Sequence, residues 1–274
     1  MHYMKAIAMP VSRTFLFVPG DRDDRFDKAA AAGAHDVILD LEDAVDPDAK
    51  EAARAKIAGW TGRTAARVRI NGLETPWFDE DIAFARREGL RKLVIPKAEP
   101  HVVRRVRAAL GDDVDIVALI ETVAGLLGLR DLCAERGRLR LAFGNLDFSL
   151  DAGITETERE LDPVRLQLAL ESRHAGLPAP IDGVFTGLSD TMGLAAQVKR
   201  AKALGLGGKL CIHPSQVAVV NAGWQPAPEE LDWARRVIGA VEAGGAGVIS
   251  LDGKMVDRPV VERAREIIGA SAAE

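Results

Sequence analysis

Two acidic residues, Glu121 and Asp147, stand close to the ends of apolar runs that are typical of buried strands. Glu121 directly follows Asp115–Ile120, and Asp147 lies 26 residues further along, shortly after Phe143. This spacing corresponds to one βα repeat, so the two carboxylates are expected to project from adjacent strands toward one cavity. Carboxylates without a neighbouring Cys or His favour a hard cation, above all Mg²⁺ and also Mn²⁺. The alternative interpretation is that each residue caps a helix.

A second charged group follows two other apolar runs. Asp40, Glu42 and Asp43 come after Val37-Ile38-Leu39, and Arg69 lies near the end of the next run. The planar guanidinium of an arginine is suited to bind a carboxylate through two parallel hydrogen bonds, so Arg69 is a candidate clamp for a carboxylate ligand. The alternative is an ion pair between Arg69 and Glu42 or Asp43 across neighbouring strands. Both interpretations can hold together.

Two further basic residues also follow apolar runs. Lys97 stands where a Schiff-base lysine could act, but the nearby Glu99 favours an ion-pairing lysine. His213 precedes a proline, and a lone histidine in that position is more often structural than ligand-binding.

The elements that position these residues alternate along the chain. Short apolar runs are followed by loops and by Ala-, Arg- and Glu-rich stretches with helical spacing, which predicts βα units and a parallel sheet. Eight strands are predicted: Thr14–Val18, Asp36–Leu41, Ala66–Ile70, Lys92–Pro96, Asp115–Ile120, Arg138–Phe143, Ile181–Phe185 and Lys209–Ile212. The predicted helices are Asp23–Ala32, Pro47–Trp60, Trp77–Glu88, Pro100–Leu110, Thr122–Ala134, Pro163–Gly176, Asp190–Ala203 and Pro214–Ala222.

Eight strands close a TIM barrel, the (β/α)8 fold, in which working residues lie at the carboxyl ends of the strands. A doubly wound open sheet is the rival, but no G-x-G-x-x-G follows the first strand. Asp46 before Pro47 predicts a helix start, while Gly89 and Gly205 predict helix ends. We therefore expect an α/β fold with a TIM-barrel catalytic domain over residues 11–223.

Residues 224–274 are expected to form a C-terminal helical appendage. Pro226-Ala227-Pro228 precedes the helix-like stretch Glu229–Ala243, and a glycine-rich turn, the run Val248–Leu251 and a last helix from Pro259 follow. So short a segment is expected to pack on the barrel or on a neighbouring subunit. Asp252 and Asp257 are expected in a turn and at a helix N-cap.

Composition excludes several classes of function. The 274 residues carry a formal net charge of −5 without a long basic run, so no nucleic-acid partner is expected. No apolar window is long enough for a transmembrane helix. The two cysteines, Cys133 and Cys211, have no metal-binding spacing and are expected to be buried thiols in a reducing cytoplasm. A small-molecule partner is therefore predicted.

The ordered motifs resemble those of the citrate lyase β-subunit and the malyl-CoA, citramalyl-CoA and 3-hydroxy-3-methylglutaryl-type CoA-ester lyases, which are TIM barrels. The resemblance covers about Arg13 to Ile268. The matching motifs are Arg13-Thr14-Phe15-Leu16-Phe17-Val18-Pro19-Gly20, Leu39-Asp40-Leu41-Glu42-Asp43-Ala44-Val45, Val68-Arg69-Ile70-Asn71-Gly72, Ile95-Pro96-Lys97, Ile120-Glu121-Thr122, Phe143-Gly144-Asn145-Leu146-Asp147 and Gly208-Lys209-Leu210-Cys211-Ile212-His213-Pro214-Ser215-Gln216.

The resemblance implies a role for each candidate residue. Glu121 and Asp147 hold Mg²⁺, and Arg69 binds the keto-acid carboxylate and faces the developing enolate. Residues near the entrance for CoA, or in contact with it through backbone atoms, are Arg13, Lys28 in the loop Asp21–Lys28, Ile212, His213 and Pro214. Asp40, Glu42 and Asp43 surround the metal waters and the arginine. Asp257, in a segment similar to that of malyl-CoA and citramalyl-CoA lyases, is the proton-transfer residue.

The function that the resemblance implies is a Mg²⁺-dependent carbon–carbon lyase. It cleaves a 3-hydroxyacyl-CoA of the citramalyl-CoA, malyl-CoA or citryl-CoA type into acetyl-CoA and a 2-keto acid. A homo-oligomer, a trimer or hexamer, is expected. Two alternatives stay open: a class II aldolase that acts on free 2-keto acids, and a citrate lyase β-like subunit that needs a partner protein.

Overall fold

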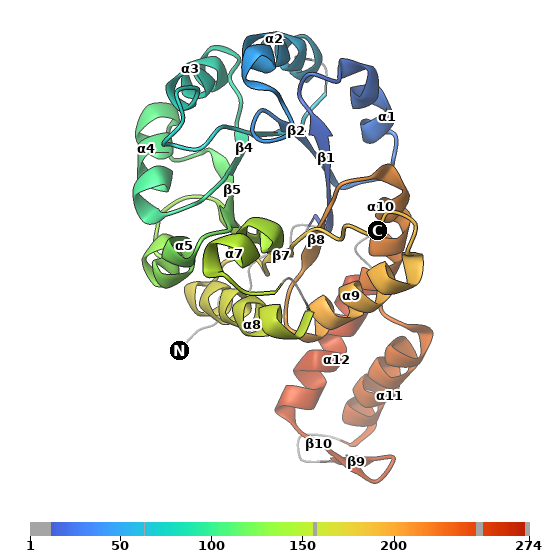
Figure 1. The fold of residues 1–274 in the computed structure, drawn as a ribbon. Coiled ribbons are helices and arrows are strands. Elements are labelled where there is room, and N and C mark those ends of the chain that lie inside the picture. Colours follow the sequence, from blue (N-terminus) through green and yellow to red (C-terminus); the bar gives the residue numbers. More distant parts are fainter. Residues whose placement is uncertain (1–11, 63, 156–157, 245–248, 272–274) are drawn as a thin grey trace. The chain divides into compact units, whose positions relative to one another are not determined.

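The computed structural model describes residues 12–62, 64–155, 158–244 and 249–271 (Figure 1). The chain divides into two compact units, one formed by Val11–Asn221 and the other containing residues 222–271. Within the described residues, no helix is long and apolar enough to cross a membrane.

The first unit is a closed barrel of parallel strands, ordered β1 to β8 as in the sequence, with β1 paired to β8 (Figure 1). The prediction of a TIM barrel is therefore confirmed. The strands are β1 (Thr14–Pro19), β2 (Asp36–Asp40), β3 (Arg67–Arg69), β4 (Lys92–Ile95), β5 (Asp115–Ile120), β6 (Leu139–Phe143), β7 (Ile181–Asp182) and β8 (Gly208–Cys211).

Helices surround the barrel, as Figure 1 shows. They are α1 (Phe26–Ala30), α2 (Lys50–Thr61), α3 (Phe78–Arg87), α4 (Pro100–Leu110), α5 (Val123–Leu127), α6 (Leu129–Cys133), α7 (Asn145–Ala152), α8 (Glu158–Ala175), α9 (Thr191–Ala203) and α10 (Pro214–Trp224). Short 3₁₀ helices, η1 (Asp23–Arg25) and η2 (Pro47–Ala49), precede α1 and α2. Gly89 and Gly205 adopt the left-handed φ values of 64° and 89° predicted for helix ends.

One predicted helix is wrong and one helix was missed. The expected continuous helix Thr122–Ala134 is divided at Gly128 into α5 and α6, since glycine is a poor helix former. Helix α7 was not predicted, because Leu146 and Leu150 are exposed while Asn145 and Ser149 are buried, which hides the usual apolar periodicity.

The barrel interior is layered. Its middle is an apolar cluster made of Phe15, Ile38, Val94, Val117, Leu119, Ala142, Ile181 and Leu210. At the amino-terminal end of the strands, Arg67 pairs with Asp36 at 3.1 Å and with Asp115 at 2.9 Å. Arg69 follows Arg67 by two residues on β3, and it lies beside Asp40 of β2 in the register of the two strands. The apolar layer therefore separates two charged layers, and the second one faces the carboxyl ends of the strands.

The second unit contains α11 (Pro228–Gly244), a hairpin of β9 (Ile249–Leu251) and β10 (Lys254–Val256), and α12 (Arg258–Ser271). Asp252 and Gly253 form the turn with φ values of 52° and 73°, the conformation that Asp-Gly hairpins favour. Strand β10 was not predicted. Ala234, Val237, Val256 and Ala264 form the apolar core of this unit.

Both cysteines are buried and free within the described residues, as predicted. Burial raises the pKa of the thiol to about 11 in Cys133 and to about 12 in Cys211. Neither thiol is therefore a reactive thiolate at neutral pH.

Candidate active site at the carboxyl ends of the strands

A guanidinium held by two carboxylates lies at the base of the site. Arg69 Nε and Nη2 donate to Asp40 Oδ1 and Oδ2 at 2.7 and 2.6 Å, and Nη1 lies 2.7 Å from Glu42 Oε2. The predicted ion pair therefore exists with Glu42 and also with Asp40. Burial lowers the pKa of Arg69, but Asp40 and Glu42 outweigh it, so the pKa is raised and the guanidinium is charged.

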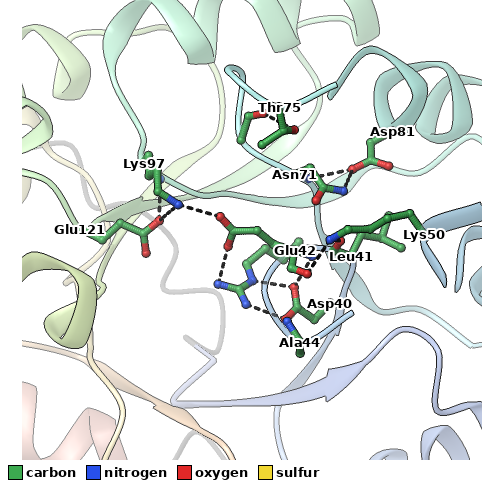
Figure 2. Close-up of polar contacts among 12 residues, drawn as sticks. Asp40, Leu41, Glu42, Ala44, Lys50, Asn71, Thr75, Asp81, Lys97 and Glu121 are labelled. Carbon is green, nitrogen blue, oxygen red and sulfur yellow. Dashed lines mark hydrogen bonds and ion pairs between the residues drawn. The ribbon is translucent and has the colours of Figure 1, made fainter. Parts of the chain in front are cut away.

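The backbone after β2 is fixed from two sides, which sets the positions of Asp40 and Glu42. Asp40 accepts hydrogen bonds from the backbone N–H groups of Glu42 and Ala44. From the first turn of α2, the buried Lys50 donates to the carbonyl oxygens of Leu41 and Glu42 at 2.6 and 2.7 Å (Figure 2). Both carboxylates are thus pre-positioned around Arg69.

Lys97 connects this pair to Glu121. Figure 2 shows the lysine between the two glutamates: Nζ donates to Glu42 Oε1 at 3.0 Å, and the backbone N–H donates to Glu121 Oε1 at 2.8 Å. Burial lowers the pKa of Lys97, but Glu42 and Glu121 outweigh this effect and raise it. A protonated, ion-paired amine is unsuited to Schiff-base formation, as the sequence favoured, although the partner of Lys97 is Glu42 and not the expected Glu99.

Glu121 has an unused oxygen. The side chain is 1% exposed, and its Oε2 has no hydrogen-bond partner among the described residues. Burial, followed by the charge of Glu42, raises the pKa of Glu121 from 4.5 to about 8. A buried anionic oxygen without a donor is costly, so this position suits a cation.

Gly144 makes room for that glutamate. A Cβ atom at Gly144 would lie 2.6 Å from Glu121 Oε2, closer than real Cβ atoms approach other atoms. The glycine at the end of β6 is therefore needed for the position of Glu121.

Asp147 lies in the first turn of α7 and is exposed. Its charge contributes to the raised pKa of Glu121, so the two carboxylates are close enough to interact. The capping interpretation is wrong: the α5 cap is Thr122, which accepts from the N–H of Gly125, and no side chain caps α7.

In the described part of the chain, no cluster of three or more His, Cys, Asp or Glu residues forms a metal site. Two carboxylates match Mg²⁺, which usually keeps several water or substrate ligands.

Residues 13–214 match the family model described as HpcH/HpaI aldolase/citrate lyase. The chain belongs to this family. The resemblance found in its motifs is confirmed. The family that the chain belongs to contains aldolases and lyases.

Curated relatives cover nearly the whole chain. A citrate lyase subunit beta-like protein of Deinococcus radiodurans is 34% identical and covers 95% of this chain and 97% of its own length. An L-malyl-CoA/beta-methylmalyl-CoA lyase of Cereibacter sphaeroides is 31% identical over 94% of this chain and 93% of its own. A (3S)-malyl-CoA thioesterase of the same species is 31% identical, with 95% of each chain covered.

A solved structure is similar as well. CitE from Mycobacterium tuberculosis, in complex with magnesium, acetoacetate and coenzyme A, aligns with a TM-score of 0.87 at 30% identity. The alignment covers 96% of this chain and 100% of that chain.

Other residues predicted from the family resemblance lie in several places. Asp43 is exposed beside Glu42, and Lys28 is exposed on α1. Ile212, His213 and Pro214 are exposed and directly follow β8. The Ile212 N–H donates to Gln216 Oε1, and His213 Nδ1 lies 2.7 Å from Ser215 Oγ. These three residues stand at a carboxyl end, as a ligand-binding loop of a barrel does.

Arg13 requires a correction. It precedes β1, and its carbonyl oxygen accepts the N–H of Lys209 at the start of β8. Because parallel strands begin at the same end of the barrel, Arg13 lies at the amino-terminal end of β1 and not at the edge that carries Glu121.

Asp257 lies in the C-terminal unit, between β10 and α12. Its Oδ1 accepts the N–H of Val260 at 3.3 Å, so it occupies the N-cap position that its local sequence predicts.

Several residues that shape this family member's site were missed. Lys50 was not singled out because a lysine in a predicted helix is usually solvated. Asn145 was missed too: its Oδ1 accepts the N–H of Val184 at 2.8 Å and ties α7 to the segment after β7. Its place within Phe143-Gly144-Asn145-Leu146-Asp147 was the available signal.

The raised pKa of Glu121 predicts a pH-dependent stability in metal-free protein. Between pH 4.5 and about 8, the folded state binds a proton at Glu121 that the unfolded state has released, so stability falls as pH rises through this window. Glu121→Gln, which carries no charge, should flatten that slope and be more stable than wild type at pH 8. Urea unfolding in EDTA at several pH values measures both. The exposed control Glu51→Gln should keep the wild-type slope, and an unchanged slope in Glu121→Gln would contradict the prediction.

Proposed function

We propose that the protein is a Mg²⁺-dependent lyase that cleaves a 3-hydroxyacyl-CoA of the citramalyl-CoA, malyl-CoA or citryl-CoA type. The products are acetyl-CoA and a 2-keto acid. The observation that carries the proposal is the buried, unpartnered Oε2 of Glu121 at the carboxyl ends of the barrel strands, where Asp147 follows the neighbouring strand β6. The names of the lyase relatives and the magnesium and coenzyme A of the CitE structure support it.

Glu121 and Asp147 are the proposed metal ligands. Bound Mg²⁺ supplies a Lewis acid that polarises the hydroxyl or keto oxygen of the substrate. The hydrogen bond from Lys97 N–H to Glu121 Oε1 fixes the carboxylate so that Oε2 faces away from this donor. Glu121 is thus oriented before ligands arrive, which reduces the cost of binding.

Arg69 is the proposed electrostatic catalyst. Asp40 and Glu42 hold its guanidinium rigidly, and a fixed positive charge stabilises negative charge that develops on the substrate without reorganising first. As the carbon–carbon bond breaks, that charge passes to the enolate of acetyl-CoA. Asp43, exposed beside Glu42, belongs to the proposed surroundings of the metal waters.

Asp257 is the proposed proton donor to the enolate carbon and the base in the reverse reaction. We propose that the C-terminal unit brings it to a barrel within a homo-oligomer. Lys28 and the exposed segment Ile212-His213-Pro214 are the proposed contacts for CoA.

The function is tested by acetyl-CoA release from citramalyl-CoA, malyl-CoA, citryl-CoA and 3-hydroxy-3-methylglutaryl-CoA, each with Mg²⁺ and with EDTA. We expect Mg²⁺-dependent release from at least one of them, which names the acyl group. Cleavage of free hydroxy-keto acids alone would replace the proposal with the class II aldolase. Release of free CoA without acetyl-CoA would point to a thioesterase. No cleavage at all would favour a subunit that needs a partner protein.

Asp257→Asn tests the proton-transfer role. Asparagine caps helices as well as aspartate does, so stability should change little. The kcat should fall by at least about 100-fold because the general acid is lost, while affinities for Mg²⁺ and the keto acid in calorimetry stay at wild-type values. Asp252→Asn, in the turn of the hairpin that precedes Asp257, is the control. Retained turnover in Asp257→Asn would remove Asp257 from the mechanism.

A further inference from the structure

Lys97 has a backbone conformation that residues with side chains rarely adopt. Its φ is 44°, in the left-handed region. Strained conformations of this kind are maintained where the surrounding structure requires them, and they concentrate at functional sites. Here the conformation directs both the backbone N–H and the side chain of Lys97 toward the two buried glutamates, Glu121 and Glu42 (Figure 2).

The ammonium of Lys97 is the accessible part of an otherwise buried network. The side chain of Lys97 is 52% exposed, whereas those of Glu42 and Arg69 are 6% and 11% exposed. Of the three N–H donors of an ammonium, one is directed to Glu42 Oε1, and Glu121 Oε1 lies 4.0 Å from Nζ. The ammonium of Lys97 is therefore held by Glu42, partly exposed, and near enough to Glu121 for one small ligand to contact both residues.

An anionic ligand needs such a cation here. Asp40 and Glu42 are buried around the site and repel an incoming carboxylate, and Glu121 adds to this repulsion once it has lost its proton. All three nitrogens of Arg69 already lie within 2.7 Å of Asp40 or Glu42, and these two carboxylates offset part of its positive charge. The ammonium of Lys97 is not surrounded in this way.

We propose that Lys97 is a ligand-binding residue whose ammonium binds the carboxylate of the 2-keto acid held beside Glu121. This inference rests on the proposed function, since that function supplies the keto acid. It gives Lys97 two separate tasks: the backbone N–H orients Glu121, and the side chain attracts the ligand. A substitution of the side chain separates the two, because the backbone N–H is retained.

The test uses calorimetry on the full chain with Lys97→Met, which keeps the length of the side chain and removes its charge. Mg²⁺ alone is titrated first, and pyruvate is then titrated into Mg²⁺-saturated protein. Pyruvate affinity should fall at least about tenfold, as expected for the loss of a charge-assisted hydrogen bond. Mg²⁺ affinity should change by less than about threefold, because the bond from the residue 97 N–H to Glu121 persists.

Two further probes make the result specific. Pyruvamide, which lacks the carboxylate charge, should bind Lys97→Met and wild type equally, and Lys97→Arg should recover part of the pyruvate affinity. Lys92→Met is the matched control: Lys92 lies at the start of β4, the strand that precedes Lys97, is 39% exposed and pairs with the buried Asp36 at 3.2 Å. It should leave both affinities unchanged.

The outcomes separate the two proposals. Unchanged pyruvate affinity in Lys97→Met overturns the inference, and so does an equal loss for pyruvate and pyruvamide. A parallel loss of Mg²⁺ binding also overturns it, because Lys97 would then act by holding the carboxylates. A wild-type protein that binds neither Mg²⁺ nor pyruvate overturns the proposed function itself.

Discussion

The ion pairs of Asp40 and Glu42 with Arg69 are the interaction on which the rest of the site depends. Three carboxylates are buried at the carboxyl ends of the strands, and each one is costly to remove from water unless a cation or donors face it. Arg69 satisfies two of them with ion pairs of 2.6 and 2.7 Å. Glu42 then meets Lys97 with its other oxygen, and the backbone of Lys97 fixes Glu121. A chain of contacts thus runs from the guanidinium of Arg69 to Glu121, whose Oε2 has no hydrogen-bond partner among the described residues.

The barrel makes that arrangement possible by its layering. The apolar cluster below the site excludes water from one side, so the charges above it interact in a medium of low polarity and are held in fixed directions. The contacts come from the ends of several strands and from Lys50 at the start of α2. A site whose members lie on different rigid elements keeps its geometry before a ligand arrives, which is what electrostatic catalysis requires.

Much of this could be predicted from the sequence, and the exceptions have physical causes. The strands were found because buried parallel strands are continuous apolar runs. Strand β7 is shorter than predicted, since Val184 leaves the ladder and bonds to the Asn145 side chain instead. Arg69 and its acidic neighbours were recognised from their places at strand ends. The positive φ of Lys97, the buried Lys50 and the close approach of Gly144 to Glu121 depend on contacts between distant segments, which no local pattern contains.

We propose the unpartnered oxygen of Glu121 as a metal ligand, and a Mg²⁺ titration of Gly144→Ala measures whether it is one. The added methyl group meets Glu121 Oε2 and leaves every carboxylate in the sequence unchanged. Gly59→Ala on α2 is the control, because its Cβ meets no atom within 4 Å. We expect Gly144→Ala to lose at least about tenfold in Mg²⁺ affinity, whereas Gly59→Ala should bind Mg²⁺ like wild type. Wild-type Mg²⁺ affinity in a folded Gly144→Ala protein would show that Glu121 Oε2 is not a Mg²⁺ ligand.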